Sequence, residues 1–127
     1  DTCLIVDGKS LDIIKKSGLN ERFVEYAVTA PTVICCRCAP QQKSEMVQLV
    51  QEYSGKRTCA IGDGGNDVAM IQKSHVGIGI FGKEGQQAAA ASDFSILKFE
   101  YIARLLLDHG RVAYKGTAKV AQFVLHR

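Results

Sequence analysis

Short apolar runs alternate along this chain with stretches in which apolar residues recur every three or four positions. The runs predict β-strands at residues 3–6, 32–36, 58–61, 76–80 and 94–97. The periodic stretches predict α-helices at residues 11–16, 20–26, 40–53, 68–72 and 86–91. Strands that alternate with helices of about ten residues predict an α/β fold with a mostly parallel sheet and flanking helices.

The helix that follows Pro40 has the clearest pattern. Its apolar positions recur at i, i+3, i+4 and i+7 from Met46 to Tyr53. Proline suits the first position of a helix, and Gly55 is a typical stop signal. We therefore expect one long helix between the second and third strands.

The end of the chain differs from the rest. From residue 99 onward no strong strand signal occurs, and residues 101–107 are richly apolar and helical. Gly110 and Gly116 weaken a continuing helix without forbidding it. We expect a sheet-containing part at residues 1–98 and a helical segment at residues 99–127.

The composition is that of a soluble globular α/β domain. The chain has 127 residues, 46% of them hydrophobic and 23% charged. No apolar run reaches the ~18 residues that a membrane-spanning helix needs. The opening Asp1-Thr2-Cys3 is neither a start methionine nor a charged leader, so we expect a piece of a larger protein.

The five cysteines do not form an obvious framework. An odd number argues against a closed set of disulfides and favours a reducing compartment. Cys35 and Cys38 have C-x-x-C spacing, but a structural zinc site needs a second ligand pair. Cys3 and Cys59 fall within separate predicted strands, where we expect them to be small buried apolar residues.

The net charge of +3 is unevenly distributed. Residues 98–127 contain six basic and two acidic side chains, a net charge of +4, which leaves −1 for the rest of the chain. Such a segment suits a nucleic acid or the flank of a membrane. No pattern of aromatic residues for base stacking accompanies it, so nucleic-acid binding is not favoured.

The turn after the third predicted strand is rich in residues that bind magnesium and phosphate. Gly62-Asp63-Gly64-Gly65-Asn66-Asp67 contains two carboxylates, an amide and three glycines. Ligands of open α/β sheets bind at the carboxyl ends of strands, and carboxylates are hard oxygen ligands suited to Mg²⁺. A tight turn with Asn66 as a helix cap is the alternative, but a cap requires fewer such residues.

Lys43 is the second candidate site residue. It follows the second predicted strand and lies near the start of the long helix, where the helix dipole already favours anions. If the strands that begin at Thr32 and Thr58 are neighbours, Lys43 and Asp63 converge at one edge of the sheet. A lysine for the phosphate, a carboxylate for Mg²⁺ and a second carboxylate to orient the lysine form a phosphoryl-transfer site.

A nucleophile for this chemistry is harder to find. Asp7 ends the first predicted strand, and an aspartate at that place can be phosphorylated in principle. It lacks a second acid two residues later and a hydroxyl directly after Gly8. These residues favour a turn aspartate.

Three segments resemble a known family. Lys43 with the turn at residues 62–67 resembles the later motifs of the haloacid dehalogenase superfamily of aspartyl phosphotransferases. The segments CCRCAPQQKSEMV, AIGDGGNDVAMIQKSHVGIGIFGKEGQQAAAASDFSI and LLLDHGRVAYKGTAKVAQFVLH are similar to the phosphorylation domain of P-type ATPases. They are most similar to the phospholipid-flippase class, type IV.

The resemblance implies a role for each candidate. Asp63 would coordinate Mg²⁺, and Asn66 and Gly64 would contact the phosphoryl group. Asp67 would hold Lys43, and Lys43 would neutralise charge on the phosphate. Lys43 and Asp67 are therefore the expected catalytic residues.

The resemblance also implies an architecture. Residues 1–98 would be part of a Rossmann-like, haloacid dehalogenase-like phosphorylation domain. Residues 99–127 would be a helical stalk that leads toward a membrane helix absent from the sequence. The family's Asp-Lys-Thr-Gly-Thr motif and its Thr-Gly-Asp loop are also absent, so the isolated chain is expected to be inactive.

The implied function is ATP hydrolysis coupled to phospholipid translocation. ATP and phospholipid would be partners of the full-length protein and Mg²⁺ its cofactor, with an accessory subunit allowed and no nucleic acid. The chain would be a cytosolic domain of an integral protein of an endomembrane or the plasma membrane. The alternatives are a soluble magnesium-dependent phosphatase with Asp7 as nucleophile and a non-catalytic domain that retains the fold.

Overall fold

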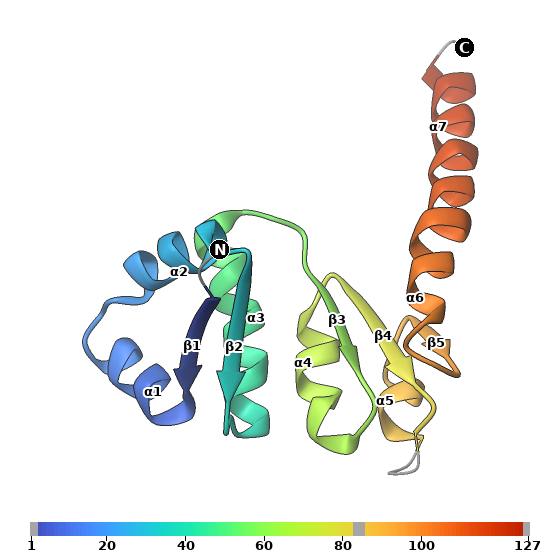
Figure 1. Cartoon of the computed structure of the whole chain (residues 1–127). Coiled ribbons are helices and arrows are strands. Elements are labelled where there is room, and N and C mark those ends of the chain that lie inside the picture. Colours follow the sequence, from blue (N-terminus) through green and yellow to red (C-terminus); the bar gives the residue numbers. More distant parts are fainter. Residues whose placement is uncertain (1–2, 83–85, 126–127) are drawn as a thin grey trace. The chain divides into compact units, whose positions relative to one another are not determined.

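The computed structural model describes residues 3–82 and 86–125 (Figure 1). The chain divides into two compact units, Asp1–Ser95 and Ile96–Arg127. The elements of the first unit follow in chain order, with the last strand at the boundary: β1 (Cys3–Asp7), α1 (Gly8–Lys16), α2 (Asn20–Thr29), β2 (Thr32–Cys36), α3 (Pro40–Ser54), β3 (Cys59–Gly62), the 3-10 helix η1 (Gly65–Asp67), α4 (Val68–Lys73), β4 (Val76–Ile80), α5 (Gln87–Ala90) and β5 (Phe94–Ile96). The prediction of an α/β fold is confirmed.

Two small sheets hold these strands. β1 and β2 are parallel, with Cα partners from Cys3↔Thr32 to Asp7↔Cys36. The other sheet has the order β3-β4-β5, and its β3 and β4 are parallel. β2 and β3 are not hydrogen-bonded neighbours, so the expected single sheet is divided in two. Helices α1 and α2 connect β1 to β2, and these two strands pair with each other. Helix α3 then leads to β3, which pairs with β4 in the other sheet (Figure 1).

The ends of α3 show how sequence sets local structure. Pro40 is the first helical residue, where its missing N–H costs nothing. The backbone N–H of Ala39 donates to the Gln42 side chain at 2.9 Å, so an amide side chain closes the helix start. Gly55 ends the helix in the left-handed conformation, with φ of 63°. The predicted start and stop are both confirmed.

The two sheets differ in how far their faces are covered. Gly77, Ile78 and Gly79 of β4 are all buried, so both faces of the second sheet are covered at this strand. The largest fully buried side chains are Val24 of α2 and Ile78 of β4. On the first sheet, Val6 is buried whereas Ile5 and its register partner Ile34 are 66% and 47% exposed. Successive strand residues point to opposite faces. One face of this sheet is therefore open among the described residues.

The structure corrects the expectation for two cysteines. Cys3 and Cys59 were expected to be buried, and both are exposed. Cys3 shares a face with Ile5, because the two are two residues apart on β1. Cys59 alternates with the buried Ala60 and so lies on the other face of β3. All five cysteines are free thiols.

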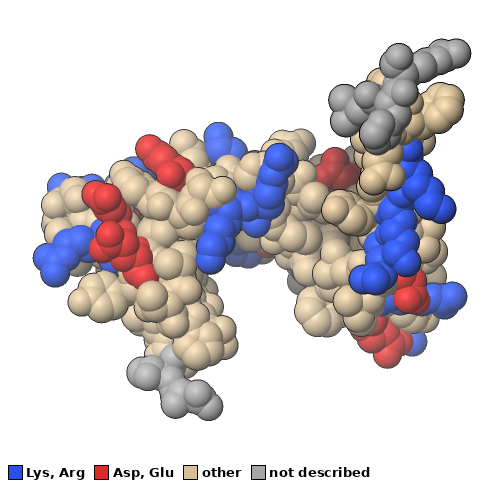
Figure 2. Space-filling view, turned by 90° about the horizontal axis from the view of Figure 1, so that it is seen from above, with Lys and Arg blue, Asp and Glu red and all other residues tan. Residues whose placement is uncertain are grey.

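The second unit is helical among its described residues. It contains α6 (Tyr101–Arg104), a π-helical segment η2 (Leu105–Gly110) and α7 (Arg111–Leu125). The helical pattern was predicted, but its π-helical stretch was not. A π segment accommodates a wider turn than an α-helix and leaves the apolar pattern almost unchanged. Lys and Arg side chains gather in this part of the chain (Figure 2).

None of the helices in the described part of the chain is long and apolar enough to cross a membrane. Large apolar side chains of α7 are nevertheless exposed, among them Val112, Tyr114, Val120 and Phe123. Val112, Val120 and Phe123 fall on one side of this helix, and that apolar side is exposed among the described residues.

We expect Ile78→Ala to destabilise the first unit by about 2–5 kcal/mol, because the substitution removes a fully buried side chain and leaves a cavity. Ile5→Ala, at an exposed position of β1, is the matched control and should cost about 0.5 kcal/mol. Urea unfolding of the two variants measures the difference. Equal unfolding free energies would contradict the assignment of the core to β4.

Candidate functional site

An ion pair between α3 and η1 lies at the centre of the candidate site. Lys43 Nζ lies 2.8 Å from Asp67 Oδ1, within a hydrogen bond. The side chains are 31% and 11% exposed, so the pair is largely withdrawn from water. Coulomb attraction is stronger in such surroundings than at a free surface. The structure thus brings together the lysine and the second carboxylate that sequence analysis selected.

Helix α3 brings Lys43 to this place. The lysine is the fourth residue of the helix, and its backbone N–H donates to Ala39 O at 3.1 Å. α3 contacts both η1 and α4. Sequence analysis relied on neighbouring strands for this convergence, and that condition is wrong, because β2 and β3 lie in different sheets. The packing of α3 against η1 and α4, and not strand pairing, brings Lys43 to the turn after β3.

The turn after β3 wraps around the Asp67 carboxylate. The N–H of Asp63 donates to Asp67 Oδ2 at 3.3 Å, and the N–H of Asp67 donates to Gly64 O at 3.1 Å. A Cβ on Gly62 would lie 2.3 Å from Asp67 Cβ. Only glycine leaves room here, so the close approach of strand and carboxylate explains one of the three glycines.

The two carboxylates of the turn therefore differ in availability. Asp67 is buried, and each of its oxygens already accepts a hydrogen bond. Asp63 is exposed and lies beside Gly82, where an added Cβ would be 3.8 Å from Asp63 Oδ2. Within residues 3–82 and 86–125 its side chain makes no ion pair. Asp63 is therefore the more accessible of the two carboxylates.

The remaining candidates, Gly64 and Asn66, lie within the turn itself. Asn66 is exposed, within η1, and Gly64 is buried directly before that helix. No side-chain hydrogen bond caps η1 or α4, so Asn66 does not act as the helix cap that the simpler interpretation of the turn required.

Asp7 lies at the end of β1 and caps α1. The N–H of Ser10 donates to Asp7 Oδ1 at 2.8 Å. Hydrogen bonds from Ser10, through its side chain and then its backbone, lower the pKa of the Asp7 carboxyl below its ordinary value of 3.8. A helix cap is a sufficient role for this residue.

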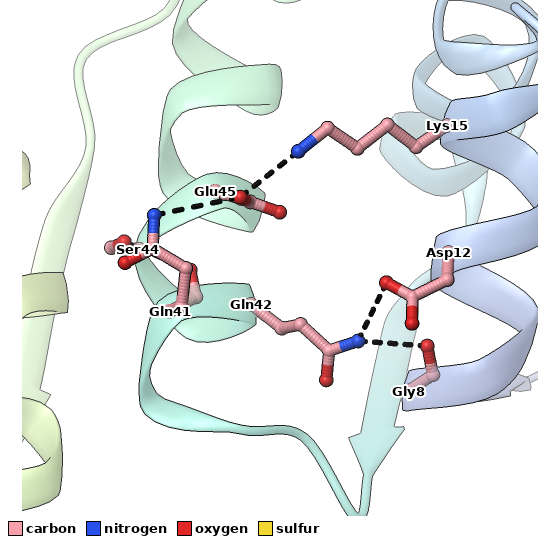
Figure 3. Close-up of polar contacts among 7 residues, drawn as sticks. All are labelled: Gly8, Asp12, Lys15, Gln41, Gln42, Ser44 and Glu45. Atoms are coloured by element: carbon pink, nitrogen blue, oxygen red, sulfur yellow. Dashed lines mark hydrogen bonds and ion pairs between the residues drawn. The ribbon is translucent and has the colours of Figure 1, made fainter.

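Gln42 is a positioning residue that sequence analysis missed. Its Nε2 donates to Gly8 O at 2.8 Å and to Asp12 Oδ1 at 2.9 Å (Figure 3). Through its Oε1 it also accepts from Ala39. It therefore ties the start of α3 to α1 one residue before Lys43. A glutamine at the third position of a helix that begins with proline was the available signal.

No group of three or more His, Cys, Asp or Glu side chains suited to a metal ion occurs within the described ranges. The exposed carboxylate of Asp63 is what the described part of the turn offers to a cation. Mg²⁺ often binds through one or two carboxylates together with water and substrate phosphate. The donor set of the turn is compatible with that mode of binding.

Known proteins share much of this sequence. The family model "Phospholipid-translocating P-type ATPase C-terminal" matches residues 89–127. The chain is 54% identical to "Probable phospholipid-transporting ATPase IIB" of Bos taurus over 127 residues, which cover 100% of this chain and 11% of that protein. It is 53% identical to "Phospholipid-transporting ATPase NEO1" of Saccharomyces cerevisiae, again over 100% of the chain and 11% of the relative.

The similarity extends to plants. "Probable phospholipid-transporting ATPase 5" of Arabidopsis thaliana is 47% identical over 98% of this chain and 10% of its own length. The chain therefore belongs to the P-type ATPases. Within that family it belongs to the phospholipid-transporting class, type IV. It spans about a ninth of the length of these relatives.

We expect Lys43→Met to lower the free energy of unfolding by about 1–3 kcal/mol, because it leaves the buried Asp67 carboxylate without its counter-charge. Lys15→Met breaks an ion pair whose side chains are 56% and 30% exposed, and should cost less than about 1 kcal/mol. A double-mutant cycle with Asp67→Asn measures the coupling directly. Additive effects of Lys43→Met and Asp67→Asn would show that the ion pair does not stabilise the fold.

The Asp7 cap predicts a dependence on pH. Because its folded pKa is lowered, its stabilising effect is present above the ordinary pKa of 3.8 and is lost as pH falls through the folded value below it. An NMR titration should place the Asp7 carboxyl below 3.8, and Ser10→Ala should raise that pKa. A pKa unchanged by Ser10→Ala would contradict the assigned cause.

Proposed function

We propose that this chain supplies the magnesium- and phosphate-binding half of the aspartyl-phosphate site of an ATP-driven phospholipid transporter. The observation that carries the proposal is the Lys43–Asp67 ion pair beside the free Asp63 carboxylate. The relatives carry the name phospholipid-transporting ATPase, in one case with the word probable, and these names support the same class of activity.

Lys43 would neutralise charge on the phosphoryl group. A lysine on a flexible stem loses side-chain entropy when it is held in one place. Lys43 would lose this entropy on folding and not on substrate binding, because Asp67 Oδ1 already holds its Nζ. Asp67 Oδ2 in turn accepts a hydrogen bond from the Asp63 amide. A preorganised charge of this kind stabilises a transferring phosphoryl group without rearrangement.

Asp63 would hold Mg²⁺ through its exposed carboxylate. When bound, the ion would neutralise phosphate charge as a Lewis acid. Asn66, exposed on the same turn, would donate its amide N–H to a phosphoryl oxygen. Gly64 would leave space for the backbone to approach the phosphate.

The wider architecture follows from the family. Residues 1–98 would be part of a Rossmann-like, haloacid dehalogenase-like phosphorylation domain, and residues 99–127 a helical stalk next to the membrane. The parallel pairs β1–β2 and β3–β4 and the exposed basic side chains of α7 suit these roles. ATP and phospholipid would be the substrates of the whole protein, and this part of it would be cytosolic.

The phosphorylated aspartate would come from another part of the protein. The sequence contains no Asp-Lys-Thr-Gly-Thr motif, and the carboxylate of Asp7 is bound in the α1 cap. The isolated chain is therefore expected not to hydrolyse ATP or phosphate esters. Ester hydrolysis that is lost in Asp7→Asn would instead support a soluble phosphatase.

The test uses the full-length transporter that contains this chain. Asp63→Asn should reduce the Mg²⁺-dependent formation of acid-stable phosphoenzyme from radiolabelled ATP by at least about tenfold, because it removes a charged ligand. Asp108→Asn, at an exposed position of η2, is the control and should be phosphorylated normally. Normal phosphorylation of Asp63→Asn at low Mg²⁺ would overturn the proposal.

A further inference from the structure

Helix α5 rests directly on the backbone at the end of β4. A Cβ on Gly79 would lie 2.4 Å from Ala89 Cα and 2.6 Å from the Ala88 carbonyl oxygen, so a side chain at residue 79 would collide with the backbone of the helix. The Ala88 side chain is fully buried and packs with Ala60 and Ile71. These contacts fix the place of α5 on the sheet.

The place of α5 brings its first residue, Gln87, to the turn after β3. The helix contacts η1, and a Cβ on Gly65 would lie 2.0 Å from Gln87 Oε1 and 3.2 Å from its Cδ. The Gln87 amide therefore lies against residue 65, in the middle of the turn. Its neighbours Gly64 and Asn66 are the residues proposed to contact the phosphoryl group.

The contact accounts for the glycine at residue 65. Among the described glycines a positive φ occurs at Gly18 and Gly55, so the backbone conformation of Gly65 does not by itself require glycine. The absence of a side chain instead leaves the space that the Gln87 amide fills. Sequence analysis treated the glycines of the turn as a sign of ligand binding, whereas this one also admits a side chain from α5.

We propose that Gln87 is a positioning residue of the phosphate site, and this inference rests on the proposed function. A backbone rich in glycine has more conformational freedom to lose when it binds a ligand. A side chain that packs against the middle of the turn restricts this freedom before Mg²⁺ and phosphate bind, and so lowers the entropic cost of binding. Gln87 thus acts through the turn and not by contact with the phosphoryl group.

Helices α3 and α5 then hold the turn at two different points. Helix α3 holds its last residue through the ion pair of Lys43 with Asp67. Helix α5 holds its middle through the packing of the Gln87 amide on Gly65. Because Gln87 is exposed to solvent, removal of its side chain should disturb the order of the turn much more than the stability of the fold.

The full-length transporter that contains this chain is the protein to test. Phosphoenzyme formation from radiolabelled ATP is measured over a range of Mg²⁺ concentrations, and the melting temperature is measured in parallel. Gln87→Ala should raise the Mg²⁺ concentration for half-maximal phosphorylation by about fivefold and leave the melting temperature unchanged, because the turn must then be ordered on binding. Gln86→Ala, at the exposed residue directly before α5, is the matched control and should behave as the unaltered transporter does.

A second substitution separates positioning from direct contact. Gly65→Ala reduces the freedom of the turn backbone and places a methyl group in the space that Gln87→Ala leaves. Added to Gln87→Ala, it should bring the Mg²⁺ requirement back to within about twofold of the unaltered transporter. A Mg²⁺ requirement that stays raised in the double variant would show that the amide acts on the ligand itself, and would overturn the positioning role.

Other results would also contradict the inference. An unchanged Mg²⁺ requirement in Gln87→Ala, an equal rise in Gln86→Ala, or a melting temperature that falls together with phosphorylation would overturn it. If Asp63→Asn reduces phosphorylation and Gln87→Ala does not alter it, this inference alone fails. If Asp63→Asn is phosphorylated normally at low Mg²⁺, the proposed function fails.

Discussion

The buried carboxylate of Asp67 must be paired, and this requirement determines the structure around the turn that follows β3. Asp67 is withdrawn from water by the turn after β3, and a buried charge is tolerated only with a counter-charge and hydrogen bonds. Lys43 supplies the charge and the Asp63 amide supplies a further donor. The pairing fixes where α3 lies against η1, and it leaves Asp63 as the free carboxylate of the turn.

Helix α3 connects this electrostatic constraint to the rest of the first unit. Gln42 ties the beginning of the helix to α1, and Lys43 follows it and reaches η1. The two residues are neighbours in sequence but serve different sides of the helix, because successive residues are about 100° apart. The same helix thus links the element that follows β1 with the turn that follows β3, although their strands belong to different sheets.

The elements of the fold could be predicted because their signals are local. Proline at residue 40, glycine at residue 55 and the spacing of apolar residues determine α3 without reference to the rest of the chain. The division into two sheets could not be predicted, because strand pairing depends on which other strands are present and not on the strand itself. The exposure of Cys3 and Cys59 escaped prediction for the same reason, since a sheet face is buried only if another element covers it.

The residues of the candidate site could be selected from the sequence, but their arrangement in space could not. Carboxylates, glycines and an amide within six residues indicate ligand chemistry in any α/β fold. Which carboxylate is buried and which is free depends on the close approach of Gly62 to Asp67, a tertiary contact with no local signature. The π-helical turn at Leu105–Gly110 was missed because its apolar pattern differs little from that of an α-helix.

A structure of the full-length transporter with Mg²⁺ and beryllium fluoride, a phosphate analogue, tests the central claim most directly. We expect an oxygen of Asp63 at about 2.0–2.1 Å from the ion. We also expect Lys43 Nζ at about 3 Å from the analogue, still paired with Asp67. An ion without Asp63 among its ligands, or an analogue bound far from Lys43, would contradict the claim.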